Sequence, residues 1–242
     1  MIRQIIIFSA FITVLFSNTL AAQDVRRWED IDTTGYFNED MLQQNGITLL
    51  FINKDSLANL QSISALKEVF WKIYPEEMKR FNRKSPKTVT IMIGKEYKGV
   101  AASLHAVIKI DQDWIRNNPE DIDLLTHELM HVVQGYTYDV PDNWLTDGLA
   151  DYARYAFGVN NVKSGWSLPP YHPGQSFKDS YRIAARFLVW AEKNKHKHLV
   201  ERLDNALRNG SYNRRLWVKL TGLGLNELWS AYAANPDLNM PF

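Results

Sequence analysis

A short segment near the middle of the chain, His127-Glu128-Leu129-Met130-His131, constrains the fold more than any other part of the sequence. Its two histidines are four residues apart, so on a helix they lie one turn apart on the same face. Most of the surrounding positions from Ile122 to Val133 are apolar, and a helix of that composition has to be largely buried. The segment therefore predicts an interior helix whose polar edge carries both histidines.

This edge has the chemistry of a metal site. Two neutral imidazoles at this spacing can both reach one Zn²⁺ ion at about 2.0–2.1 Å. Glu128 lies beside them and is placed to act as a general base on water at the metal. Two histidines that simply face solvent are the alternative, but the apolar surroundings disfavour it. The motif predicts His127 and His131 as zinc ligands and Glu128 as the catalytic base.

A zinc site of this class needs a third protein ligand, usually a carboxylate from a second helix. Asp147 follows His131 by sixteen residues, and Asp151 comes one helical turn later. Asp147 is the candidate ligand, whereas Asp151 would accept a hydrogen bond from the free ring nitrogen of a ligating histidine and fix its tautomer. The alternative is a solvent-exposed helix face on which Asp151 pairs with Arg154.

The first 22 residues differ from the rest of the chain. Arg3 precedes an almost wholly apolar run, residues 5–16, and the small residues Ala21 and Ala22 close the segment. This pattern is typical of a cleaved secretory signal peptide, whereas a membrane anchor, the alternative, needs more apolar residues to span a hydrocarbon layer of roughly 30 Å. We therefore expect export to the periplasm or the extracellular space, no stable membrane insertion, and a single domain over residues 23–242.

The composition excludes some partners. The chain has 28 Lys and Arg residues and 27 Asp and Glu residues, and Arg3 is the only charged residue in the predicted signal peptide. The mature protein is therefore formally neutral, and without a basic cluster nucleic acid is not expected as a partner. The chain has no cysteine, so core packing has to stabilise it without disulfides.

Apolar periodicity and turn residues predict an α+β fold, with a small sheet followed by a mostly helical second half. Short apolar segments bounded by turn residues predict strands at residues 46–53, 88–94 and 105–111. Helical spacing predicts helices at residues 60–81 (interrupted at Pro75), 118–134, 141–157 and 177–195, followed by two or three shorter ones. Residues 23–40 are polar and predict a tether with little structure.

Two further expectations concern the surroundings of the histidine helix. Gly148 costs about 1 kcal/mol in a helix interior, which fits if the second helix packs closely against the first. The strand at residues 105–111 could pair with an extended peptide substrate, which would add a strand to the sheet. Alternatively, it is an ordinary edge strand.

Several longer stretches resemble the basic secretory protein family of plants and bacteria, a set of zinc peptidases. They follow one another in order over roughly 200 residues, which makes the resemblance more specific than the five-residue motif alone. The stretches are residues 69–76 (VFWKIYPE), 98–102 (KGVAA), 126–134 (THELMHVVQ), 144–154 (WLTDGLADYAR) and 181–188 (YRIAARFL), with Asn209-Gly210 and Leu228-Trp229 closing the match.

The resemblance implies a zincin-like fold with an edge strand above the active-site helix. It implies a zinc metallopeptidase that acts on a peptide or protein, with His127, His131 and the residue at position 147 as zinc ligands. Glu128 would be the catalytic acid. Tyr181 matches a family tyrosine that could stabilise the oxyanion, although it could instead belong to the core.

One position departs from the family pattern. Asp147 stands where the family usually has Glu, whose side chain is one methylene longer. Asp can ligate zinc, but the helix must then come closer or the metal affinity falls. Two alternatives therefore stay open: an exported protein of the same fold that binds a partner with weak or no catalysis, and a zinc hydrolase that cleaves a different kind of amide.

Overall fold

A computed structural model describes Trp28, Asp30 and residues 35–137 and 140–238. The predicted signal peptide and most of the predicted tether lie outside these residues. All the elements described below belong to one unit, Thr33–Phe242. Within the described ranges, no helix combines the length and the apolar character that a membrane crossing requires.

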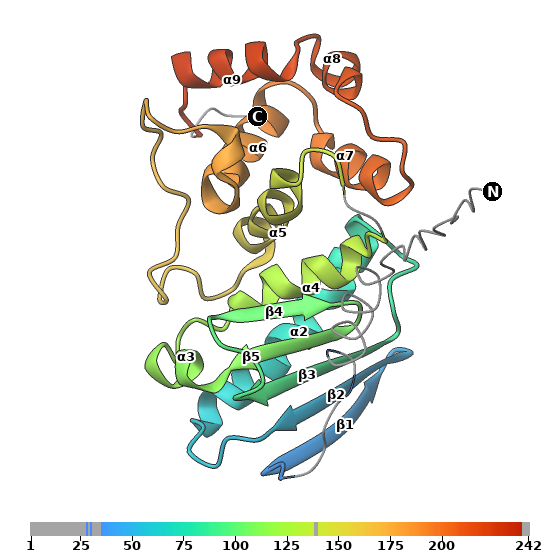
Figure 1. Cartoon of the computed structure of the whole chain (residues 1–242), viewed down its shortest axis with the longest axis vertical. Coiled ribbons are helices and arrows are strands. Elements are labelled where there is room, and N and C mark those ends of the chain that lie inside the picture. The colour runs from blue at the N-terminus through green and yellow to red at the C-terminus, as the bar shows by residue number, and fades with distance from the viewer. Residues whose placement is uncertain (1–27, 29, 31–34, 138–139, 239–242) are drawn as a thin grey trace, which may run out of the picture. The chain divides into compact units, whose positions relative to one another are not determined.

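The first half of this unit forms a mixed five-stranded sheet (Figure 1). The strands lie in the order β1-β2-β3-β5-β4; the three central strands are parallel, and each outer strand is antiparallel to its neighbour. β2 and β3 confirm two of the predicted strands. The bounds are β1 (Asn38–Gln44), β2 (Ile47–Asn53), β3 (Thr88–Gly94), β4 (Ala101–Leu104) and β5 (Val107–Asp111).

Two hairpins complete the sheet, and neither was predicted. β1 begins inside the segment predicted as a tether and turns into β2 at Asn45 and Gly46, whose φ angles are 52° and 76°. The second hairpin joins β4 to β5 at His105, where φ is 53°. The third predicted strand therefore begins at Val107. β5 also lies between β3 and β4, so the expectation that it pairs with a substrate is wrong, and so is the alternative that it is an edge strand.

Helices follow the sheet and also connect its strands. Together with the sheet they give the predicted α+β arrangement, mostly helical in its second half. The helices are α2 (Leu60–Arg80), α3 (Gln112–Asn117), α4 (Leu124–Gln134), α5 (Trp144–Phe157), α6 (Tyr181–Asn194), α7 (Leu199–Arg208), α8 (Arg215–Thr221) and α9 (Leu225–Ala234), with a short 3-10 helix η1 (Phe177–Asp179) before α6.

The predicted interruption of α2 at Pro75 is wrong. The helix runs from Leu60 to Arg80 with the proline inside it. Phe70 and Ile73 before the proline and Met78 after it are all buried. Tertiary packing of an apolar face supplies most of the stability of a helix in a protein, and here it outweighs the cost of the proline.

α4 begins later than predicted. Residues 119–120 and 122–123 form turns, and the helix starts at Leu124. Asp123 is fully buried, and its carboxylate accepts a hydrogen bond from the backbone N–H of Val159 at 2.9 Å. The acidic residues before the helix thus form contacts with distant segments and do not extend the helix. At the other end, Gly135 has a φ of 53° and stops the helix as predicted.

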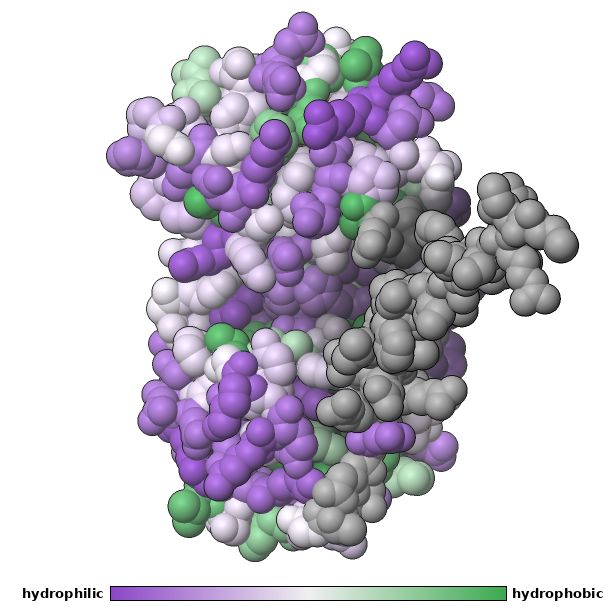
Figure 2. Space-filling model, in the orientation of Figure 1, coloured by the Kyte–Doolittle hydropathy of each residue, from purple (hydrophilic) through white to green (hydrophobic). Residues whose placement is uncertain are grey.

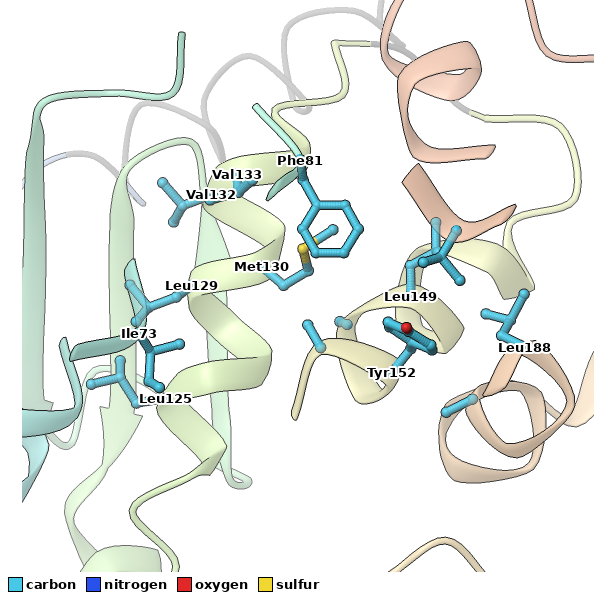
Figure 3. Packing of buried hydrophobic residues seen from close by; sticks show 14 of the residues in the cluster. Ile73, Phe81, Leu125, Leu129, Met130, Val132, Val133, Leu149, Tyr152 and Leu188 are labelled. Atoms are coloured by element: carbon cyan, nitrogen blue, oxygen red, sulfur yellow. The ribbon is translucent and has the colours of Figure 1, made fainter. Parts of the chain in front are cut away.

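α4 lies between the sheet and the helical half (Figure 1). It packs against α2, β4 and β5, and also against α5. Figure 3 shows Leu129 on the side of α2 and the strands, whereas Met130 points toward α5. Every residue of the helix is buried except His127 and His131, which are partly exposed. The predicted interior helix with both histidines on one polar edge is therefore present.

Candidate metal centre

The two histidines of α4 and one carboxylate of α5 converge on a common point. The Nε2 atoms of His127 and His131 are 3.1 Å apart. The Oδ1 atom of Asp147, in the first turn of α5, lies 3.8 Å from Nε2 of His127 and 3.6 Å from Nε2 of His131. Tetrahedral ligands of one zinc ion are about 3–4 Å apart. The three side chains form a group that could hold a metal ion, and their donor atoms suit zinc.

The shorter side chain of Asp147 does not keep its carboxylate away from the histidines, because α5 packs directly against α4. The site is also open to solvent. The exposed fractions of the side chains are 13% for His127, 19% for His131 and 31% for Asp147. Figure 2 shows a hollowed, mostly hydrophilic region on the face seen there, at the level of α4 and β4. Solvent and a substrate can therefore reach the three side chains.

Asp151 lies behind His127. Its Oδ1 atom is 2.6 Å from Nδ1 of His127, so a neutral imidazole that donates from Nδ1 has Nε2 available as a metal ligand. The alternative of a surface pair with Arg154 is wrong. Both residues are buried, and Arg154 forms its ion pair with Asp121 instead.

Gln134 holds His131 in the corresponding way, although this role was not predicted from the sequence. Its Oε1 atom is 2.8 Å from Nδ1 of His131. Its Nε2 atom donates to the backbone carbonyl of Thr146 at 2.9 Å. The spacing contained the signal, because residues three apart on a helix are neighbours on its surface.

The two histidines differ in proton affinity. Burial alone would lower the pKa of His127, but the hydrogen bond to Asp151 and the nearby carboxylates outweigh burial and raise it above its ordinary value. Burial lowers the pKa of His131, and the charge of His127 lowers it further. Metal ligation requires neutral imidazoles, so a metal ion at this site would compete with protons for both rings.

Glu128 supplies a buried carboxylate next to the first histidine. Only 7% of the residue is exposed. Its Oε2 atom is buried, and it has no hydrogen-bond partner among the residues that the structure describes. A buried oxygen without a partner is costly. This environment suits a base whose partner is a water molecule or a substrate.

Tyr181 lies over the site at the start of α6. Its ring stacks on that of His127, with centroids 6.2 Å apart and an interplanar angle of 14°. Because 56% of Tyr181 is exposed, the alternative that it belongs to the core is wrong. The helix predicted over residues 177–195 is split here, since Ser180 and Tyr181 have φ angles of 56° and 47°. The charge of Asp147, followed by burial, raises the pKa of Tyr181, so its hydroxyl remains a hydrogen-bond donor at neutral pH.

Gly148 allows a close helix approach, although to a different helix from the one expected. A Cβ atom at this position would lie 2.8 Å from Cβ of Ala184 in α6. The glycine therefore serves the contact between α5 and α6 rather than the contact between α5 and α4. With α4 on one side and α6 on the other, α5 is held from both sides where it carries Asp147.

Comparison with known proteins gives a family and some distant structural likenesses. A model of the family BSP, described as peptidase of plants and bacteria, matches residues 49–232. A search of curated proteins found no similar sequence. The fold is similar to an M1 zinc metallopeptidase from Deinococcus radiodurans, with 11% identity, a TM-score of 0.44, and coverage of 84% of this chain and 51% of that one. An aminopeptidase N family protein from Idiomarina loihiensis has 12% identity, a TM-score of 0.39, and coverage of 81% and 41%.

The chain spans about half the length of these solved structures or less. The family model, in contrast, covers most of the chain, from β2 to α9. It includes all six residues of the candidate site that the sequence identified, together with Gln134. The chain therefore belongs to the BSP family, the peptidases of plants and bacteria.

Proposed function

We propose that the protein is an exported, zinc-dependent metallopeptidase with a zincin-like fold, in which a signal peptide at residues 1–22 precedes one catalytic domain at residues 23–242. The observation that carries the proposal is the convergence of His127, His131 and Asp147 beside the buried Glu128. Membership of a peptidase family supports it. His127, His131 and Asp147 would hold the zinc ion, which would supply an activated water molecule and polarisation of the substrate carbonyl group.

The remaining chemistry belongs to the protein. Glu128 takes a proton from the attacking water and passes it to the leaving amine nitrogen; its partner-free Oε2 atom supports this role. Tyr181 donates a hydrogen bond to the developing oxyanion, and the stacking of its exposed ring on that of His127 supports this role. Asp151 holds the proton of His127 at Nδ1, which leaves Nε2 for the metal ion that the site would hold.

We place the peptide substrate along β4, the strand at the edge of the sheet. β4 pairs with β5 on one side, and no strand in the described part of the chain pairs with its other side. It packs against α4, and all four of its residues are partly exposed. A peptide that adds to this edge is held by backbone hydrogen bonds, and it would lie beside the helix that carries the site.

Metal analysis together with digestion of a peptide library tests the proposal. We expect the mature protein to carry about one zinc ion per chain, and we expect a chelator to remove both the metal and the cleavage. Cleavage that persists in thoroughly metal-free protein would contradict a metallopeptidase. Zinc without cleavage of any peptide would favour a partner-binding protein, or a hydrolase of another amide if such an amide is cleaved.

A further inference from the structure

Gln134 connects two parts of the candidate metal centre that come from different helices. Through Oε1 it accepts from Nδ1 of His131, and through Nε2 it donates to the carbonyl of Thr146, the residue before Asp147. It is the last residue of α4, and only 1% of it is exposed. Both hydrogen bonds are therefore shielded from water, which makes them stronger than exposed ones.

We propose that Gln134 is a positioning residue that sets the geometry between His131 and Asp147; the proposal rests on the zinc site described above. The amide is the side chain that this bridge requires, because one end accepts from an imidazole N–H while the other donates to a carbonyl. A carboxylate offers the acceptor but not the donor, and an aliphatic side chain offers neither.

The bridge has a counterpart at the other histidine. His127 is held directly by Asp151 of α5, at 2.6 Å, whereas His131 is held by Gln134, which in turn holds the backbone of α5. Each imidazole is thus tied to α5 through its Nδ1 atom. These two contacts fix the register of α4 against α5. They thereby fix the positions of the proposed ligands relative to one another.

The length of the third ligand makes this register important. Asp147 has one methylene group fewer than Glu. If the helix backbone moves, rotation of the Asp147 side chain can therefore restore the position of the carboxylate less well than rotation of a Glu side chain could. Its Oδ1 atom lies 3.6 Å from Nε2 of His131. A shift of α5 at Thr146 would therefore move the carboxylate away from the metal position.

Zinc affinities of two Gln134 variants test the bridge, with competition against a chromogenic chelator as the measurement. Gln134→Leu removes both hydrogen bonds and should weaken zinc binding about 10–100-fold, as other changes behind metal ligands do. Gln134→Glu should also weaken it, because the carboxylate still accepts from His131 but repels the carbonyl of Thr146. Gln112→Leu, which alters another buried glutamine, is the matched control and should bind zinc as the wild type does.

Gln134→Glu keeps the hydrogen bond with His131 but loses the one with Thr146. Its zinc affinity therefore shows whether Gln134 positions both ligands or orients His131 alone. Wild-type zinc affinity in this variant would overturn the proposal. A double-mutant cycle supplies a second test: once Asp147→Ala has removed the ligand that the bridge positions, Gln134→Glu should weaken zinc binding no further. Additive losses would contradict a bridge to Asp147.

A metal-free readout keeps this proposal separate from the proposed function. In long-range ¹H–¹⁵N spectra of the metal-free protein, His131 should carry its proton on Nδ1, and Gln134→Leu should release it into a mixture of tautomers. An unchanged tautomer in the variant would overturn the role of Gln134. A wild-type protein that binds no zinc would instead contradict the proposed function.

Discussion

The Nδ1 atom of His127 lies 2.6 Å from Oδ1 of Asp151, one helical turn beyond Asp147. Asp147 and Asp151 lie on one face of α5, but each has a different relationship to the histidines. Asp147 lies beside the Nε2 atoms of both histidines, and Asp151 lies on the other side of the His127 ring. The proposed ligand Asp147 and the residue proposed to orient His127 are therefore carried by successive turns of one helix.

This relationship predicts a moderate effect for Asp151→Ala. The change leaves the three ligand side chains intact but removes the acceptor that fixes the His127 tautomer, so zinc binding should weaken about 10–100-fold. Asp151→Asn should lose less, since its amide oxygen can still accept from Nδ1. Chelator competition gives the affinities. If Asp151→Ala lost zinc completely, the roles of Asp151 and Asp147 would have to be exchanged.

Substitutions at Asp147 should have the larger effect. Asp147→Ala removes a ligand atom, and the variant should lose most of its zinc, as measured by elemental analysis after gel filtration. Asp147→Glu should keep the metal, because the longer side chain supplies the commoner ligand of the family that the sequence resembles. Asp113→Ala, in which an exposed carboxylate of α3 is removed, serves as the control. A full zinc content in Asp147→Ala would show that another group completes the site.

The elements that surround the site could be predicted because their sequence signals are local. β2 and β3 are short apolar runs, and α4 combines a periodic apolar pattern with a terminal Gly135. β1 was not predicted because its residues are mostly polar and exposed. The turn Asn45-Gly46 could have indicated it, since Asn-Gly is the strongest short hairpin signal between two strands.

The parts that escaped prediction depend on contacts between distant segments. The start of α4 is decided by the hydrogen bond of Asp123 with Val159, and the partner of Gly148 is Ala184 of a later helix. The role of Gln134 could not be predicted without knowing that the carbonyl oxygen of Thr146 lies 2.9 Å from its amide nitrogen. Residue spacing brings two groups onto one helix face, but it does not reveal which helix packs there.

Tyr181→Phe isolates the proposed oxyanion donor. The phenylalanine keeps the ring that stacks on His127 but lacks the hydroxyl, so kcat should fall by about 10²-fold while zinc content stays unchanged. Tyr155→Phe changes another exposed tyrosine, on α5, and should leave kcat as it is. An unchanged kcat in Tyr181→Phe, measured on any substrate found by the library digest, would exclude the hydroxyl from the reaction.

A buried carboxyl group away from the metal centre makes a prediction about stability. Glu77 on α2 is fully buried, and within the described residues neither of its carboxyl oxygens has a hydrogen-bond partner. Burial raises its pKa well above the ordinary value. Glu77→Met removes this unpartnered polar group and should raise the free energy of unfolding by about 1–3 kcal/mol.

The pH dependence of this gain has a definite sign. The pKa of Glu77 is higher in the folded protein than in the unfolded chain, where it is about 4.3. The wild type therefore loses stability as the pH rises above about 4.3. Denaturant titrations should therefore show a larger gain from Glu77→Met at about pH 7.5 than at about pH 4. The exposed Glu68→Met should show no such difference. A gain that is equal at both pH values would contradict a raised pKa of Glu77 in the folded protein.

Zinc content and turnover of Glu128→Gln, measured on one preparation, test whether Glu128 is the catalytic base of a zinc peptidase. The substitution keeps the three ligands and the shape of the side chain but removes the base. We predict about one zinc ion per chain, as in the wild type, with nearly all peptide cleavage lost, while Glu39→Gln at an exposed position retains both. Cleavage by Glu128→Gln at close to the wild-type rate, with zinc bound, would contradict this account.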